Sequence, residues 1–245
     1  MKHFIIPGIL TAFFSLNAYA TLEDTSGFYL GGDVLATDYT FDTQVQFPEI
    51  PQFNESTSLE TWDATVLGRL GGYLTWGEDN ILFTAIDVFG EPNSAIVREM
   101  ENHFQDVPLG KADKYFDQQI EARYSLGGEL KQGVFVTDNI LGFLTAGLVY
   151  TQFKYTLAST FLTSSQEAFQ SYADDKFFLP GFRLGVGGEI FLFENIGFNL
   201  NAAYTWYEDK QIYGYGVANG FTSNSSHLET NALQMGAGIN IYFNL

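Results

Sequence analysis

Two histidines follow the first twenty residues, and each has a carboxylate nearby in the sequence. Glu99 and His103 lie four residues apart, so a helix would place them on one face. Imidazole and carboxylate are both ligands of divalent metals. Two ligands at one spacing do not define a metal centre, so we interpret the pair as solvated loop residues and assign no metal site and no cofactor.

A hydroxyl, an imidazole and a carboxylate also occur together near the end of the chain, in Ser225, Ser226, His227 and Glu229. These groups are the components of nucleophilic acyl transfer. A catalytic triad is defined by geometry and not by nearness in sequence. The cluster therefore leaves a hydrolase open only as a remote alternative, and we assign no catalytic residue.

The most informative charges occupy one parity of segments that otherwise alternate between apolar and polar residues. A charge buried away from water must be paired. We therefore expect an internal network of ion pairs. The nine residues assigned to it are Asp33, Arg69, Asp87, Glu121, Arg123, Glu129, Lys131, Arg183 and Glu189.

The elements that must position these residues are β-strands, because the apolar residues recur with period two. Residues 64–76 show this pattern, with Ala, Val, Gly, Leu, Gly, Leu and Trp at every second position. The pattern predicts eight strands, most of them longer than the ~9–11 residues that cross a bilayer when tilted. Their predicted spans are 27–41, 61–77, 80–90, 118–133, 139–157, 176–193, 196–208 and 230–245.

The predicted connections alternate between short and long. Those after residues 77, 133 and 193 are tight, whereas 42–60, 91–117, 158–175 and 209–229 are long. This alternation is typical of transmembrane barrels. The sequence predicts an all-β fold, an eight-stranded antiparallel up-and-down barrel with short periplasmic turns and long extracellular loops. The nine charges would then plug the lumen, and an open pore, the alternative, would prefer cations.

Aromatic residues near the strand ends agree with a membrane-spanning barrel. Trp62 and Trp76 share the outward parity of one strand and are separated by 14 residues, or roughly 35 Å along a tilted strand. Amphipathic rings favour both membrane interfaces. The interfacial aromatic residues predicted in this way are Phe28, Trp62, Trp76, Phe198, Trp206 and Phe243.

The first twenty residues have the pattern of a secretory signal peptide, with a basic start and an apolar run too short to span a bilayer. Ala18 and Ala20 supply the small residues before the expected cleavage. The domains are thus a signal peptide at 1–20 and a barrel at 21–245. The formal net charge of -18 argues against nucleic acid as a partner, and the lack of cysteine excludes disulfides and thiolate chemistry.

Together with the Gly-Phe-Tyr-Leu-Gly-Gly opening at 27–32 and the Gly-Ile-Asn-Ile-Tyr-Phe segment at 238–243, these features resemble the small eight-stranded outer-membrane barrels, the opacity-type surface antigens and the OmpA membrane domain. The resemblance implies a Gram-negative outer membrane, lipid and lipopolysaccharide as surroundings, and the barrel assembly machinery as a partner during biogenesis. That machinery reads a terminal aromatic residue in the family, whereas this chain ends in Leu245, with Phe243 two places earlier.

We therefore expect a non-enzymatic surface or structural protein whose loops contact host or envelope ligands. A narrow channel for small solutes, resembling the OmpW type, is the alternative. The remote alternative is an outer-membrane enzyme that modifies lipid A, although the His-x-Ser-Asn signature of the deacylases is missing at His227.

Two of the long loops carry signals for short helices. Ser94 would cap one that places Ile96, Met100 and Phe104 on one stripe. Residues 164–167 have the capping-box pattern Ser-Ser-Gln-Glu, and they predict a second helix that reaches Tyr172.

Overall fold

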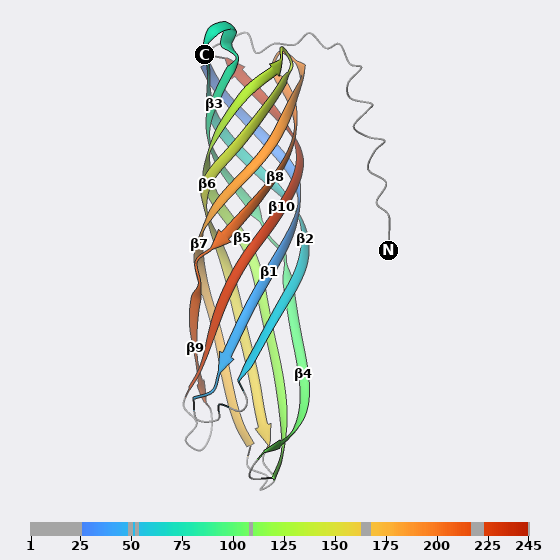
Figure 1. The fold of residues 1–245 in the computed structure, drawn as a ribbon, viewed down its shortest axis with the longest axis vertical. Coiled ribbons are helices and arrows are strands. Elements are labelled where there is room, and N and C mark those ends of the chain that lie inside the picture. The colour runs from blue at the N-terminus through green and yellow to red at the C-terminus, as the bar shows by residue number, and fades with distance from the viewer. Residues whose placement is uncertain are drawn as a thin grey trace, which may run out of the picture.

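The computed structural model describes residues 26–48, 51, 54–107, 110–162, 168–216 and 223–244 (Figure 1). The expected signal peptide, with Ala18 and Ala20, lies outside these residues. Within the described part of the chain, no helix has the length and apolar character needed to span a membrane.

The described residues form ten antiparallel strands and one 3-10 turn. Alternating apolar and polar residues favour this structure, since they give every strand one buried and one exposed face. The strands are β1 (Ser26–Gln46), β2 (Glu55–Trp76), β3 (Leu82–Pro92), β4 (Ile96–Val107), β5 (Gly110–Thr137), β6 (Ile140–Leu162), β7 (Ala168–Phe193), β8 (Ile196–Tyr207), β9 (Lys210–Gly216) and β10 (Ser223–Asn244), with the turn η3 at Glu78–Asn80.

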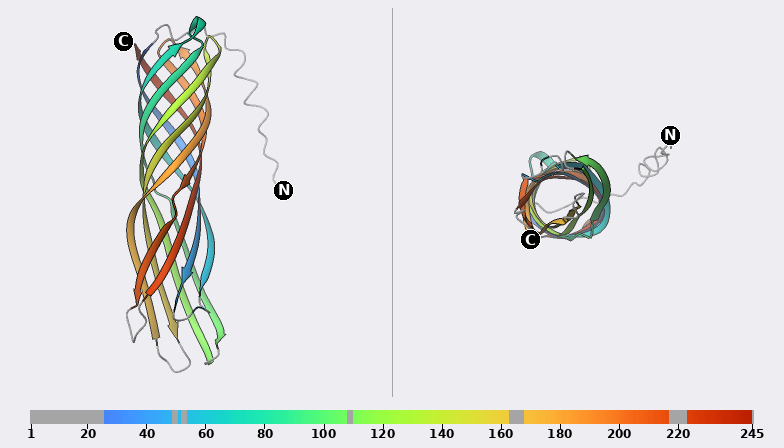
Figure 2. Two further views of the ribbon diagram at one scale, coloured as in Figure 1. Left: turned by 60° about the vertical axis from the view of Figure 1, so that its left-hand side comes forward. Right: turned by 90° about the horizontal axis from the view of Figure 1, so that it is seen from below.

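The sheet closes into a ring through eight of these strands, because β1 pairs with β10 as well as with β2 (Figures 1 and 2). The other two extend their predecessors: β4 follows β3 along β5, and β9 follows β8 along β10. Each of these two interruptions inserts one extra residue. Trp206 pairs with Asn231, and Lys210 pairs with Leu228. The step along β8 and β9 is therefore four residues, whereas the matching step along β10 is three. Over the short-turn half of the barrel, ring closure leaves no unpaired strand edge among the described residues.

The two ends of the barrel differ. At the short-turn end, tight connections at 77–81, 138–139 and 194–195 lie beside the described chain ends Ser26 and Asn244. At the opposite loop end, the strands run much farther than predicted. Most residues of the four predicted long loops belong instead to paired strands. The connections between strands at this end are 47–54, 108–109, 163–167 and 217–222.

The two predicted loop helices are wrong in the described residues. Ile96–Val107 is strand β4, fully paired with β5, and Ala168–Tyr172 is the start of β7, paired with β6. Ser94 caps no helix; its backbone N–H and hydroxyl both donate to the Asp63 carboxylate at 2.8 Å. The long ladders satisfy far more backbone groups than a short helix would, so pairing overrides the local signal. Residues 164–167 lie outside the described residues.

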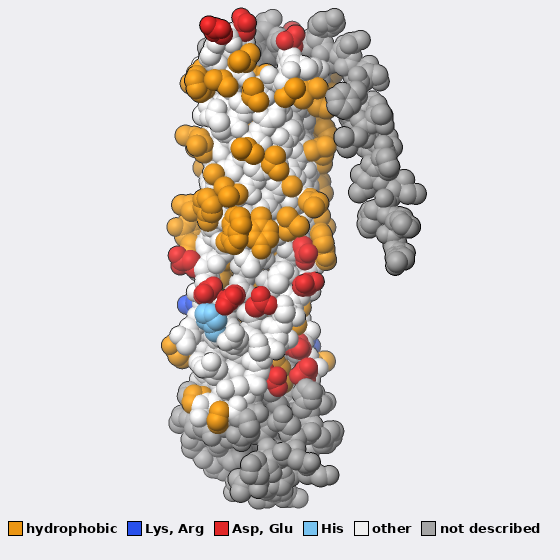
Figure 3. Space-filling view, viewed as in Figure 1, with side chains coloured by type: hydrophobic (Ala, Val, Ile, Leu, Met, Phe, Trp, Pro, Cys, Tyr) orange, Lys and Arg blue, Asp and Glu red, His pale blue; other side chains and the backbone are white. Residues whose placement is uncertain are grey.

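The outer face carries an apolar band near the short-turn end and acidic side chains beyond it (Figure 3). Trp62 and Trp76, both exposed, stand toward opposite ends of the band on β2, and Phe28 stacks on Phe243 with ring centroids 4.9 Å apart. Trp206 is also exposed, whereas Phe198 is only partly exposed. The other exposed apolar side chains include Leu30, Val34, Val66, Leu70, Ile86, Leu144, Leu148, Leu200, Met235 and Ile239.

The hairpin of β4 and β5 at the loop end should respond to acid. Arg98 donates two hydrogen bonds to Asp117, at 2.9 and 2.7 Å, and they lower the pKa of that carboxyl below its usual value. A lowered folded-state pKa contributes stability above the unfolded value of about 3.9, and that contribution is lost as the pH falls through the folded value. We expect the rate at which pepsin cleaves this hairpin in the wild type, divided by the rate for Asp117→Asn at the same pH, to be higher at pH 2.5 than at pH 4. An Asp117→Asn barrel with the same pH response would contradict this.

Candidate functional site in the barrel lumen

The inward side chains of β1 pass through successive layers of the lumen. From the short-turn end they are Tyr29, Asp33, Leu35, Thr37 and Tyr39, all buried. They mark an aromatic layer, an ionic layer, a narrow apolar layer, a polar layer and an aromatic core. The layers follow from period-two geometry, because neighbouring strands in a closed sheet bring side chains of similar height together.

Arg69 of β2 is at the centre of the ionic layer. Its guanidinium bonds to Asp33 of β1, lies 3.7 Å from an Asp87 oxygen of β3 and 3.9 Å from a Glu129 oxygen of β5. All four side chains are nearly inaccessible to solvent. One planar guanidinium thus links carboxylates from three other strands, an arrangement that a lysine could not reproduce.

Lys131 of β5 provides the second cation of the layer and has no solvent exposure. Its ammonium is 3.6 Å from Asp87 and donates to the Tyr29 hydroxyl at 3.2 Å, and that hydroxyl donates to Asp87. The ammonium also lies 4.7 Å from the centroid of the Phe143 ring. The contact with an aromatic face stabilises a cation that burial would otherwise destabilise.

Arg183 and Glu189, both on β7, complete the layer. Arg183 lies 3.9 Å from Glu129 and 4.9 Å from the centroid of the Phe89 ring. Glu189 accepts hydrogen bonds from the Asn240 amide at 3.0 Å and from the Tyr242 hydroxyl at 2.9 Å. Among the described residues, the fully buried carboxylate of Glu189 is therefore stabilised by hydrogen bonds from neutral donors rather than by a direct ion pair.

The structure removes Glu121 and Arg123 from this network. A register shift between Ala122 and Tyr124 reverses the parity of β5, so Ile120 and Ala122 face the lumen instead. Arg123 and Glu121 are partly exposed and pair with each other at 3.2 Å. The prediction from period two assumed an unbroken strand. One bulge residue is enough to turn the side chains on its loop-end side to the other face of the sheet.

Several polar groups in the lumen were missed by the sequence analysis. Glu91 is buried and accepts from the Gln234 amide, which also donates to Thr37. Asn199 and Asn201 donate to Asp33 at 3.1 and 3.3 Å. The signal for Glu91 was present, because Asp87, Phe89 and Glu91 continue one parity, but the predicted strand ended at residue 90.

Inward-facing glycines make room for these large side chains. A Cβ on Gly71 would collide with Tyr29 and Asp87, one on Gly197 with Glu189, and one on Gly238 with Asp33. Each glycine lies beside an ionic side chain of the lumen. The glycines on this face are thus part of the lumen's packing, because a methyl group there would displace an ionic side chain.

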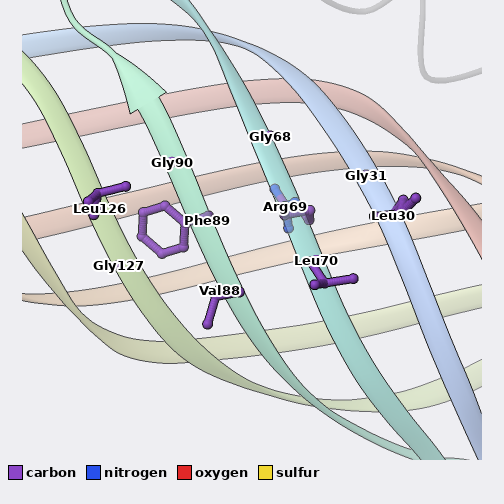
Figure 4. Close-up of a pocket in the computed structure, with 10 residues that line it drawn as sticks. All are labelled: Leu30, Gly31, Gly68, Arg69, Leu70, Val88, Phe89, Gly90, Leu126 and Gly127. Atoms are coloured by element: carbon purple, nitrogen blue, oxygen red, sulfur yellow. The ribbon is translucent and has the colours of Figure 1, made fainter.

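Glycines on the outward face have a different environment. Gly68 and Gly90 are cross-strand neighbours in a shallow hollow of the apolar wall, between Leu30, Leu70 and Leu126 (Figure 4). A Cβ on Gly68 would meet nothing within 4 Å. This position offers a natural control for substitutions on the inward face.

Toward the loop end, the lumen is filled by a packed aromatic and aliphatic core. Phe153 contacts the rings of Tyr39, Phe41, Phe177 and Tyr207, with centroids 5.4–6.4 Å apart. The core continues with buried Ile120, Leu157, Leu179, Ile212 and Leu228. Among the described residues, the buried ion pairs of the lumen are thus confined to one layer, and a large apolar cluster occupies part of its loop-end half.

The seam between β2 and β4 differs from the other strand boundaries. The β2–β3 ladder extends from Trp76 and Leu82 only as far as Gly68 and Gly90, while β4 pairs with β5. Beyond Gly68 and Gly90, hydrogen bonds that involve side chains join β2 to residues 92–99. They run from Thr65 to Pro92 O, from Ser94 to Asp63, from Thr61 to Ile96 O and from Thr57 to Glu99.

The structure separates one hydroxyl of the Ser/His/acid cluster from the histidine, whereas Ser225 and Glu229 share the outer face with His227. Ser226 faces the lumen, where its hydroxyl accepts a hydrogen bond from Tyr155 at 2.8 Å, whereas His227 lies on the outer face. Adjacent residues of a strand point to opposite faces. Glu99 accepts from Thr57, and the side chain of His103 lies outside the described residues.

The closed antiparallel sheet and the apolar outer band define a β-barrel of the outer-membrane type. Among solved structures, the outer membrane protein OprG from Pseudomonas aeruginosa is similar at 12% identity and a TM-score of 0.53, covering 92% of this chain and 100% of its own. The protease OmpT from Escherichia coli (10%, 0.42, 91% and 100%) and the neisserial surface protein NspA (13%, 0.38, 90% and 100%) are more distant. No protein-family model and no curated protein matches the sequence.

Proposed function

We propose that the protein is a non-enzymatic barrel of a Gram-negative outer membrane, with a lumen plugged by side chains and a loop end that makes the functional contacts. The observation that carries this proposal is the pair of packed layers in the described lumen, one ionic around Arg69 and Lys131 and one aromatic around Phe153. A small barrel has an interior just wide enough for side chains to fill.

The outer face supports this placement. The apolar band suits hydrocarbon, and exposed aromatic side chains near its edges suit the headgroup regions. In this orientation the short turns face the periplasm and the extended strands rise through the lipopolysaccharide layer. The loops are then presented to host or envelope ligands, since binding residues concentrate on loops held by a rigid scaffold.

Planar-bilayer conductance of the refolded protein tests the plug. We expect the wild type to show no steady conductance. Stepwise openings in the wild type would overturn the plugged lumen and favour the channel. Such openings should prefer cations, because the ionic layer has four carboxylates against three bases, Arg69, Lys131 and Arg183.

The seam between β2 and β4 favours a second candidate function, the passage of small apolar molecules between the loop-end lumen and the membrane. Here the wall is closed by a few side-chain hydrogen bonds, while the adjoining core is apolar. A protein hydrogen bond contributes about 0.5–1.5 kcal/mol, and the seam has fewer of them than a continuous backbone ladder of the same length, so this wall opens at lower cost.

A reversible cross-link tests the second candidate, and the natural chain has no cysteine to interfere. The pair Asp63→Cys and Ser94→Cys would lock the seam, and Asp42→Cys with Ser58→Cys would lock the β1–β2 ladder as the matched control. We expect oxidation to slow transfer of an apolar dye into proteoliposomes at least several-fold for the first pair only, with recovery on reduction. Equal transfer before and after oxidation of the first pair would exclude a seam pathway.

A further inference from the structure

Three side chains of ligand type converge on the outer face beyond the apolar band. The Nε2 atom of His227 lies 3.4 Å from Glu229 Oε1 and 3.7 Å from Asp209 Oδ2. The ligand atoms of all three residues lie within 4.8 Å of one another. The group is separate from the lumen, because these side chains point away from it and are partly or fully exposed.

A bulge brings Asp209 into this group. Between the pair Trp206–Asn231 and the pair Lys210–Leu228, the β8–β9 side has one residue more than β10. Both residues of this interruption, Glu208 and Asp209, are exposed. With regular alternation from Trp206, Asp209 would face the lumen, so the extra residue redirects its carboxylate toward His227, as bulges often do at sites that bind ligands.

The local electrostatics favour a cation. Asp42 of β1 pairs across the strands with Glu229, and both line a hollow of about 400 Å³ together with His227. Like charges opposite each other in a sheet are destabilising. The neighbouring base Lys210 is directed elsewhere, with its ammonium 5.3 Å from the centroid of the buried Phe177 ring. Figure 3 shows a histidine side chain among acidic ones just beyond the apolar band.

We propose that Asp209, His227 and Glu229 form a binding site for a divalent transition-metal cation of the Zn²⁺ class. An imidazole with two carboxylates is a donor set that such cations accept. A tetrahedral ion with ~2.1 Å bonds separates its ligand atoms by roughly 3.4 Å, so the two measured nitrogen–oxygen distances need little adjustment. Three protein ligands leave a fourth position for water or for an anionic group of a neighbouring molecule.

Calorimetric titration of the refolded full-length mature barrel with ZnCl₂ tests the site. We expect one equivalent of Zn²⁺ to bind, with affinity reduced at least tenfold by His227→Ala and by Glu229→Gln. Added Zn²⁺ should also shift the ring NMR signal that disappears in His227→Ala. All three ligand side chains are on the exposed face, so the variants should fold, and circular dichroism checks this.

Two matched controls separate a built site from general attraction to acidic groups. Glu60→Gln removes an exposed acid that lies on the same outer face but is not part of the proposed metal site. His103→Ala removes the other histidine beyond residue 20. Both should bind Zn²⁺ like the wild type. The proposal is overturned if the wild type binds no Zn²⁺, if Glu60→Gln weakens binding as much as Glu229→Gln, or if His227→Ala leaves the affinity unchanged.

Discussion

Replacing Arg69 by alanine should destabilise the barrel by about 3–5 kcal/mol, the range for breaking a buried ion pair by removing one partner. The variant would leave Asp33, Asp87 and Glu129 facing one another without the guanidinium that now lies among them. Urea unfolding followed by tryptophan fluorescence measures the loss. Acid pH should restore part of it, since protonation removes the charge of the stranded carboxylates.

Two comparisons make the Arg69→Ala result specific. Arg69→Lys keeps the charge but not the planar fork, so it should recover only part of the stability. Arg98→Ala removes a mostly exposed arginine whose partner is Asp117, and it should leave the global midpoint nearly unchanged. The same midpoint for Arg69→Ala and wild type would rule out a structural role for the network.

Replacing Gly238 by alanine should cost about 1–3 kcal/mol, the usual range for overpacking a filled core. The new Cβ would lie 2.8 Å from the Asp33 Cα and would also collide with Gly32 O and with the Asp33 carboxylate. Because one of these obstacles is a backbone carbonyl, rotating a side chain cannot relieve the contact. The Asp33–Arg69 bond should therefore shift or break.

Gly68→Ala is the matched control, since its Cβ would meet nothing within 4 Å on the outer wall. We expect its free energy of unfolding to stay within about 0.5 kcal/mol of the wild-type value, the range of ordinary surface substitutions. If both glycine variants lost the same stability, the effect would come from strand conformation rather than from crowding in the lumen.

The fold class could be predicted because it depends on local alternation. The apolar period that carried Trp62 and Trp76 to the outer face is visible in the residues themselves, and an all-β antiparallel barrel follows from it. The strand ends could not be predicted in the same way. Beyond the apolar band, both faces of a strand carry polar residues, as in β4, so the hydrophobic contrast that marks a strand fades while backbone pairing continues.

The candidate site could also be predicted only where the alternation of inward and outward residues is regular. The four residues Asp33, Arg69, Asp87 and Lys131 lie on stretches of strand where the alternation is unbroken, so counting residues placed them at similar heights. Arg123 was misplaced, because a bulge carries little signal in one sequence yet reverses every later parity. The grouping of Asp209 with His227 was likewise invisible, since it depends on the register between β9 and β10.

The pairing of β1 with β10 has a consequence for the order in which the barrel folds. Gly27 lies opposite Asn244, and the register continues without a break to Gln46 and Ser225, so this ladder joins the most distant segments of the described chain. Such non-local contacts form slowly, because the entropy of closing the long chain must be lost before the contacts compensate for it. The neighbouring hairpins should form first. The pairing of β1 with β10 should form last, and it closes the curved sheet into a barrel.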